Sequence, residues 1–68
     1  MRNRREALVL YALQQVQRRK NRAVYLSDVV AELAAERHED IHTEAILRQL
    51  ITHGDVMRGM EPGTYLAV

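Results

Sequence analysis

The end of the chain, residues 42–68, constrains the fold most, because a short helical pattern there runs directly into two strand-like segments. Four apolar residues recur at helical spacing, namely Ile46, Leu47, Leu50 and Ile51. Gly54 follows, at a point where the end of a helix needs a residue that tolerates left-handed backbone angles. Segments 55–60 and 64–68 then flank a Pro-Gly turn. We therefore predict a helix over about 41–53 and a hairpin that pairs 55–60 with 64–68.

Two further helices are expected upstream, at about 4–18 and 28–37. The first has an apolar face wide enough to pack against two neighbours, and Asn21 breaks its pattern. Residues 23–26 form a short extended run that we expect to pair with the hairpin. Ser27 is the predicted N-cap of the second helix, with Asp28 in its first turn.

The start of the third helix stays open between Glu39 and Glu44, because Asp40 and Thr43 could each be its N-cap. The order of elements predicts a mostly α, single-domain winged helix-turn-helix over residues 1–68, with three helices and a two- or three-stranded antiparallel sheet. Eight apolar residues are expected in its core: Leu10, Leu13, Val29, Leu33, Ile46, Leu50, Val56 and Leu66.

Composition excludes several classes of protein. Nearly half of the 68 residues (47%) are apolar, which indicates one globular domain rather than a disordered chain. There are no cysteines, so neither a disulfide nor a cysteine-based zinc site can stabilise the fold. The N-terminal arginines and the early break in the apolar run argue against a membrane span and a signal peptide. We expect an intracellular protein, in the cytoplasm or nucleoid.

The stretch from His38 to His42 reads H-E-x-x-H, the signature in which two histidines on one helical face bind zinc. Here it falls where a helix-turn-helix needs its turn, and Asp40 occupies a position that is usually apolar in zinc proteases. A third ligand, such as His53 or Glu44, is not required by the spacing. We therefore expect surface histidines, no metal, no cofactor and no catalytic activity.

The solvent side of the third helix is the candidate site for DNA. If the helix buries its apolar residues, seven others project outward: His42, Thr43, Glu44, Ala45, Arg48, Gln49 and Thr52. From these, the predicted DNA-binding residues are Thr43, Arg48, Gln49 and Thr52, because Arg, Gln and Thr read base edges or phosphates. Five basic residues elsewhere could add phosphate contacts: Arg58 on the hairpin, and Arg18, Arg19, Lys20 and Arg22.

The charges predict weak binding of double-stranded DNA. Ten basic residues face nine acidic ones, and Glu44 would repel the DNA backbone beside Arg48. An equally simple interpretation of the basic clusters is solvated surface with favourable charges at helix ends. A protein partner bound by the third helix or the hairpin, without DNA affinity, is therefore an open alternative.

The spacing Ile46…Leu50…Gly54…Val56…Pro62-Gly63…Tyr65…Val68 resembles the C-terminal winged-helix domain of minichromosome maintenance (MCM) replicative helicases. The chain departs from that family at Met57, where an aromatic residue is usual. The resemblance implies an accessory role in a hexameric DNA helicase, without catalytic residues of its own, and Met1 would then begin an excised domain. A small stand-alone transcriptional regulator is the alternative DNA-binding role.

Overall fold

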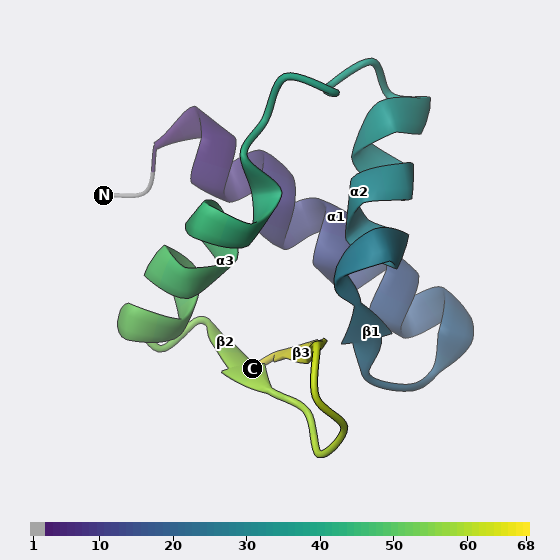
Figure 1. Cartoon of the computed structure of the whole chain (residues 1–68), viewed down its shortest axis with the longest axis vertical. Helices are drawn as coiled ribbons and strands as arrows, with labels where there is room; N and C mark the ends of the chain where they lie inside the picture. Colours follow the sequence, from purple (N-terminus) through teal and green to yellow (C-terminus); the bar gives the residue numbers. More distant parts are fainter. Residues whose placement is uncertain (1–2) are drawn as a thin grey trace.

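The fold, seen in a computed structural model that describes residues 3–68, consists of three helices and a small sheet (Figure 1). Its elements in chain order are α1 (Arg4–Lys20), β1 (Val24–Tyr25), α2 (Leu26–Ala35), α3 (Thr43–Thr52), β2 (Val56–Arg58) and β3 (Thr64–Ala67). The helix α1 packs against α2, α3 and β3, and it crosses behind α2 and α3 in the view of Figure 1. This is the predicted winged helix-turn-helix, with the β2–β3 hairpin as its wing.

The longest helix, α1, is fixed at both ends by its own sequence. At its start the Glu6 N–H donates to Asn3 Oδ1 (2.8 Å) and the Asn3 N–H donates to Glu6 Oε1 (3.2 Å), which is a capping box. At its end Asn21 adopts a left-handed conformation (φ 53°), and its N–H bonds the Gln17 carbonyl. The helix therefore runs two residues past the predicted end at Arg18.

The start of α2 corrects one prediction. Ser27 is not the N-cap but lies in the first turn, and Tyr25, the last residue of β1, occupies the cap position. The Asp28 carboxylate accepts a hydrogen bond from the Tyr25 N–H at 3.1 Å, so a side chain three residues later provides a partner for a backbone N–H at the start of the helix. Asp28 is in the first turn, as predicted. The helix also ends at Ala35, two residues earlier than expected, and Arg37 in the following turn has a positive φ of 64°.

The start of α3 corrects a second prediction. Neither Asp40 nor Thr43 is its N-cap; that position is His42, whose side chain makes no capping bond. Thr43 is buried and its hydroxyl donates to the Ile41 carbonyl, so it supports the turn before the helix. At the other end, Gly54 has a φ of 83°, which confirms the predicted helix-ending glycine.

The sheet has the order β1-β3-β2 and is antiparallel throughout. Val24 pairs with Tyr65, which confirms that the short run before α2 joins the hairpin. In the wing, Met57 pairs with Leu66, and Arg58 pairs with Tyr65. Adjacent strand residues face opposite sides of the sheet. The Met57–Leu66 pair therefore lies on one face, and the Arg58–Tyr65 pair lies on the other.

The core joins all three helices to the sheet. Seven of the eight predicted core residues are buried: Leu10, Leu13, Val29, Leu33, Ile46, Leu50 and Val56. Leu66 was predicted wrongly, because it is only half-buried. Tyr65 takes the core position instead, with 3% of its surface exposed, because the inward face of β3 begins one residue earlier.

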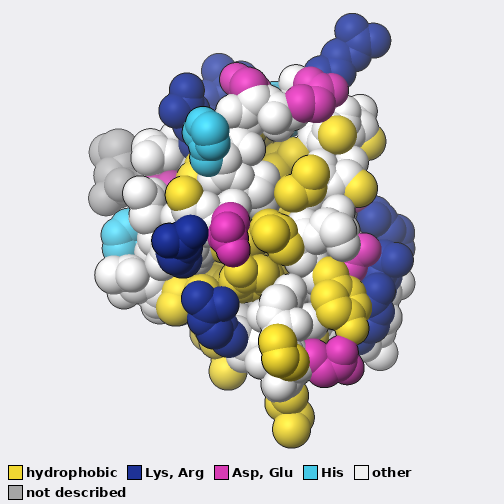
Figure 2. Space-filling view, in the orientation of Figure 1, with side chains coloured by type: hydrophobic (Ala, Val, Ile, Leu, Met, Phe, Trp, Pro, Cys, Tyr) yellow, Lys and Arg dark blue, Asp and Glu magenta, His cyan; other side chains and the backbone are white. Residues whose placement is uncertain are grey.

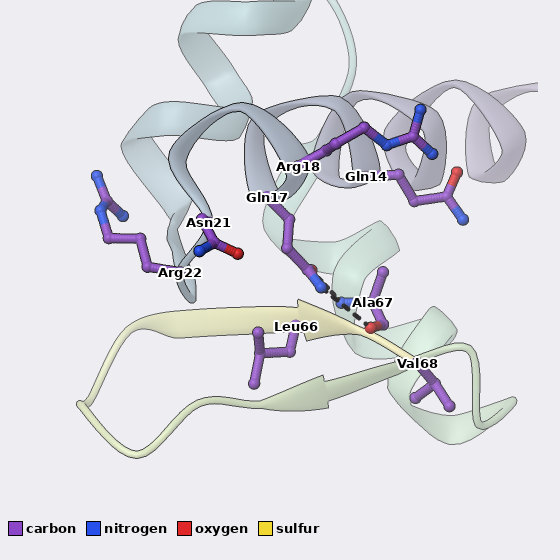
Figure 3. Close-up of a pocket in the computed structure, with 8 residues that line it drawn as sticks. All are labelled: Gln14, Gln17, Arg18, Asn21, Arg22, Leu66, Ala67 and Val68. Carbon is purple, nitrogen blue, oxygen red and sulfur yellow. Dashed lines mark hydrogen bonds between the residues drawn. The ribbon is translucent and has the colours of Figure 1, made fainter.

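The wing is also tied to α1 by one side chain. The Gln17 amide accepts the Ala67 N–H at 2.6 Å and donates to the Ala67 carbonyl at 3.4 Å (Figure 3). On this edge of β3, strand β1 reaches only as far as Tyr65. The Gln17 amide therefore completes the pairing of Ala67 where β1 no longer does.

Candidate nucleic-acid interface

The exposed side of α3 is the first part of the candidate interface. Ile46, Leu47 and Leu50 bind the helix to the core, and this leaves the opposite side open to solvent. Five residues of this side are exposed: Glu44, Ala45, Arg48, Gln49 and Thr52. Three of the four predicted contacts on this helix, Arg48, Gln49 and Thr52, are therefore accessible. Thr43 was predicted wrongly, because it points into the protein.

Charge on this side of α3 is balanced. Arg48 and Glu44, one helical turn apart, form an ion pair at 3.6 Å, and 64% and 59% of their side chains are exposed. Such an exposed pair contributes only about 0.3–0.5 kcal/mol, so a phosphate group can compete for the guanidinium. The Thr52 hydroxyl is already used within the helix, because it donates to the Arg48 carbonyl at 3.1 Å.

The wing adds one exposed basic residue. Arg58 ends β2, and its guanidinium lies 5.7 Å from the centre of the Tyr65 ring, a cation–π contact that orients an exposed side chain. Arg48 is the single basic residue of α3, and Arg58 that of β2. Figure 2 shows two basic side chains close together over this part of the molecule, beside an acidic one.

The tip of the wing carries no basic residue. It contains Met60, which is fully exposed, and Glu61, whose carboxylate accepts the Tyr25 hydroxyl at 2.6 Å. This hydrogen bond raises the pKa of Tyr25 above its ordinary value. The contact between residues 25 and 61 was not predicted, and sequence offers no signal for it. It fixes the wing tip against the start of α2.

The basic cluster Arg18, Arg19, Lys20 and Arg22 behaves differently from the α3 and wing residues. The Arg19 guanidinium donates to Glu32 of α2 at 2.9 Å, and this bond raises the pKa of Arg19. Arg22 lies 3.5 Å from Asp28, donates to the Ala23 carbonyl at 2.7 Å, and stacks over the Tyr25 ring. Two members of the cluster are therefore neutralised by α2.

The structure does not bring this cluster next to Arg48 and Arg58. In Figure 2, a strip of hydrophobic side chains separates the basic side chains over α3 and β2 from those at the far edge of the molecule, beside β1. Arg18 instead lines a groove between the C-terminal half of α1 and the end of β3 (Figure 3). The eight predicted contacts that are exposed, all except buried Thr43, therefore belong to two surfaces rather than one.

The outer face of the wing is apolar, which sequence analysis missed. Met57 is 53% exposed and pairs across the hairpin with half-buried Leu66, and Val68 is 83% exposed. The alternation of residues along 64–68 could have revealed this face, once Tyr65 rather than Leu66 was assigned to the core.

The histidine motif does not form a helical pair. His38 lies in the segment between α2 and α3, and His42 precedes α3 at its N-cap, so the two do not share a helical face. Within residues 3–68, no group of three or more His, Asp or Glu side chains is arranged to hold a metal ion. Nor does that part of the chain contain a helix of the length and apolarity needed to cross a membrane.

Comparison with known proteins adds no relative: no family model, curated protein or solved structure matches this chain.

Proposed function

We propose that this winged helix is a non-catalytic module that binds duplex DNA weakly and with little sequence preference. The observation that carries the proposal is that Arg48 on α3 and Arg58 at the C-terminal end of β2 are both exposed. A helix with Arg, Gln and Thr on its solvent side, flanked by a wing, suits the major groove and the neighbouring phosphates. The role we propose is that of an accessory domain in an MCM-like replicative helicase.

The charges set the expected strength of binding. One arginine on α3 and one on the wing provide few phosphate contacts, and Glu44 opposes them. Non-specific binders held by phosphate contacts have Kd values of roughly 10⁻⁴–10⁻⁶ M at physiological salt. We expect this protein to fall in that range.

The test is a salt-titrated binding measurement with a labelled duplex, using Arg48→Ala and Arg58→Ala. If each arginine contacts a phosphate, each substitution weakens binding to every sequence equally and makes the salt slope shallower by roughly one unit. Arg37→Ala is the matched control, because Arg37 is exposed in the turn after α2. Unchanged binding in both variants rejects the interface. A sharp sequence preference instead favours the stand-alone regulator.

The apolar outer face of the wing supports a second candidate function, recognition of a protein partner. Met57, Leu66 and Val68 together expose hydrophobic surface that DNA binding does not use. Met57→Glu distinguishes the two functions. The substitution should weaken a protein complex formed at the wing. Residue 57 lies on the face of the sheet opposite Arg58, so the substitution should alter DNA binding only through the general effect of one added negative charge.

A further inference from the structure

The distribution of charge along the chain sets α1 apart from the rest of the domain. Residues 1–22 hold seven of the ten Lys and Arg residues but only one of the nine acidic residues. Residues 23–68 hold the other three basic residues and the other eight acids. The near-neutral total therefore hides a strongly basic N-terminal segment, five of whose seven basic residues lie on α1, and an acidic remainder.

The single acid of α1 is not available at the surface. Glu6 is 5% exposed, and its carboxylate is bound in the capping box with Asn3. Its other near neighbour is His53, at 3.9 Å, which lies at the end of α3. The solvent face of α1 consequently presents no accessible carboxylate along its whole length.

The solvent face of α1 is instead a line of hydrogen-bond donors. Arg4, Tyr11 and Arg18 are seven residues apart, which places them along one side of the helix, and Gln14 lies beside them. Tyr11 is 55% exposed, the largest ring surface that α1 presents. At about 1.5 Å per residue, the line from Arg4 to Arg18 spans roughly 21 Å.

Arg18 and Arg4 form no ion pair with the acids of the described residues, although Arg4 lines the same shallow pocket as Asp40. The carboxylates of α2 engage Arg19 and Arg22, which lie at the side and end of α1, and none of the ion pairs among residues 3–68 includes Arg4 or Arg18. In Figure 3 the side chains of Gln14 and Arg18 extend along α1, away from the Gln17–Ala67 contact. The donors of this face are therefore not used to hold the fold together.

We infer that this outer face of α1, defined by Arg4, Tyr11, Gln14 and Arg18, is a second binding surface, which contacts the phosphate backbone of duplex DNA. Arginine, glutamine and tyrosine side chains are among those that donate to phosphate oxygens, and such contacts need no base sequence. Between Arg4 and Arg18, the neutral side chains of Tyr11 and Gln14 can donate hydrogen bonds. This mixture suits a regular row of phosphate groups better than a partner bound only through opposite charge.

The second surface is physically separate from the α3 and wing interface. The same face of α1 that buries Val9, Leu13 and Val16 packs against α2 and α3, so its solvent face points away from both helices. One straight duplex cannot lie on both surfaces at once. Binding at the α1 face does not depend on whether α3 binds DNA; if both surfaces bind, the domain can hold two segments of DNA.

Charge reversal tests the inference. Arg18→Glu and Tyr11→Glu change exposed positions, and Arg37→Glu is the control with the same change in net charge as Arg18→Glu. With a short labelled duplex at low salt, we expect both α1 variants to bind more weakly and Arg18→Glu to lower the salt slope by at least about one unit. Arg37→Glu should retain most of the affinity. Equal losses in Arg18→Glu and Arg37→Glu overturn the inference, as do unchanged affinities in both α1 variants.

Two glutamine side chains report the surfaces independently in an NMR titration. Gln14 lies on the α1 face and Gln49 on the exposed side of α3. Shifts of the Gln14 side-chain amide on adding duplex, lost in Arg18→Glu, support the second surface whatever Gln49 does. A shift of Gln49 alone overturns it and leaves the α3 interface standing. Shifts of Gln14 with poly-glutamate but not with DNA also overturn it and indicate an acidic protein.

Discussion

Gln17 and Ala67, fifty residues apart in the sequence, are joined by two hydrogen bonds between one side-chain amide and one peptide unit. The amide occupies the edge of β3 where β1 has ended, so it holds the wing against α1. A side chain that both donates and accepts is needed for this, and among the twenty residue types only Asn and Gln provide an amide that does so.

Replacing Gln17 by Met should therefore lower the free energy of unfolding by about 1–3 kcal/mol, because the Ala67 N–H and carbonyl lose their partner. Gln17→Glu should also destabilise the fold, since a carboxylate accepts the Ala67 N–H but cannot donate to its carbonyl. Urea unfolding measures both losses, and hydrogen exchange of the Ala67 amide locates them. Gln14→Glu, an exposed change of the same kind one turn earlier, is the control and should stay within about 0.5 kcal/mol of the wild type. Unchanged exchange at Ala67 in both Gln17 variants would show that the contact does not hold the wing.

Gly59 allows close approach between the two strands of the wing. A methyl group at residue 59 would collide with the Thr64 hydroxyl and press against Ala23. Gly59→Ala should cost about 1–3 kcal/mol by overpacking. In a Thr64→Ala background the same substitution should cost less, because the colliding oxygen is gone. Identical costs in the two backgrounds, measured by urea unfolding, would remove the steric explanation.

The hydrogen bond between Tyr25 and Glu61 should make the stability of the fold decrease at alkaline pH. Their hydrogen bond raises the pKa of Tyr25 in the folded protein above that of the unfolded chain, which is about 10. The stabilisation is therefore complete below that unfolded value and disappears as the pH rises through the folded pKa. Ultraviolet titration of the three tyrosines, compared with Tyr25→Phe, identifies the raised group. Glu61→Gln should lower the pKa of Tyr25. An unchanged tyrosine titration in that variant would show that Glu61 does not raise this pKa.

From the positions of His38 and His42 we expect zinc to have no effect on thermal stability. His38 and His42 lie outside α3, and the described residues offer no third ligand beside them. Adding zinc should leave the melting temperature nearly unchanged and produce no peptidase activity. A large zinc-dependent rise in melting temperature that His42→Ala abolishes would mean that the segment rearranges around the metal.

Sequence predicted the parts of this fold that depend on neighbouring residues. The apolar spacing of α3, the left-handed Gly54 and the Pro-Gly turn are local signals, and the helices and hairpin followed from them. One error occurred where two elements meet without a loop. Because β1 leads directly into α2, Tyr25 serves as both the last strand residue and the helix cap, which displaced Ser27 from that role.

The candidate interface was harder to predict than the fold. The helical spacing correctly predicted that Arg48, Gln49 and Thr52 are exposed. Thr43 instead points inward in the first turn of α3, because the preceding segment packs Ile41 against the core. The partners of Arg19 and Arg22 lie on α2, and residues 17 and 67 are fifty positions apart in the sequence. Such contacts are set by packing of distant elements, so no local pattern reveals them.

The most direct test of the proposed function is a map of the backbone amides that shift when duplex DNA is added at low salt. We expect fast-exchange shifts centred on Arg48, Thr52 and Arg58, which fade as salt is raised because phosphate contacts dominate. Arg48→Ala should reduce the shifts at Thr52 and Arg58 together. An absence of shifts in α3 and the wing even at low salt, with shifts there only when a protein partner is added, would contradict DNA binding by this interface.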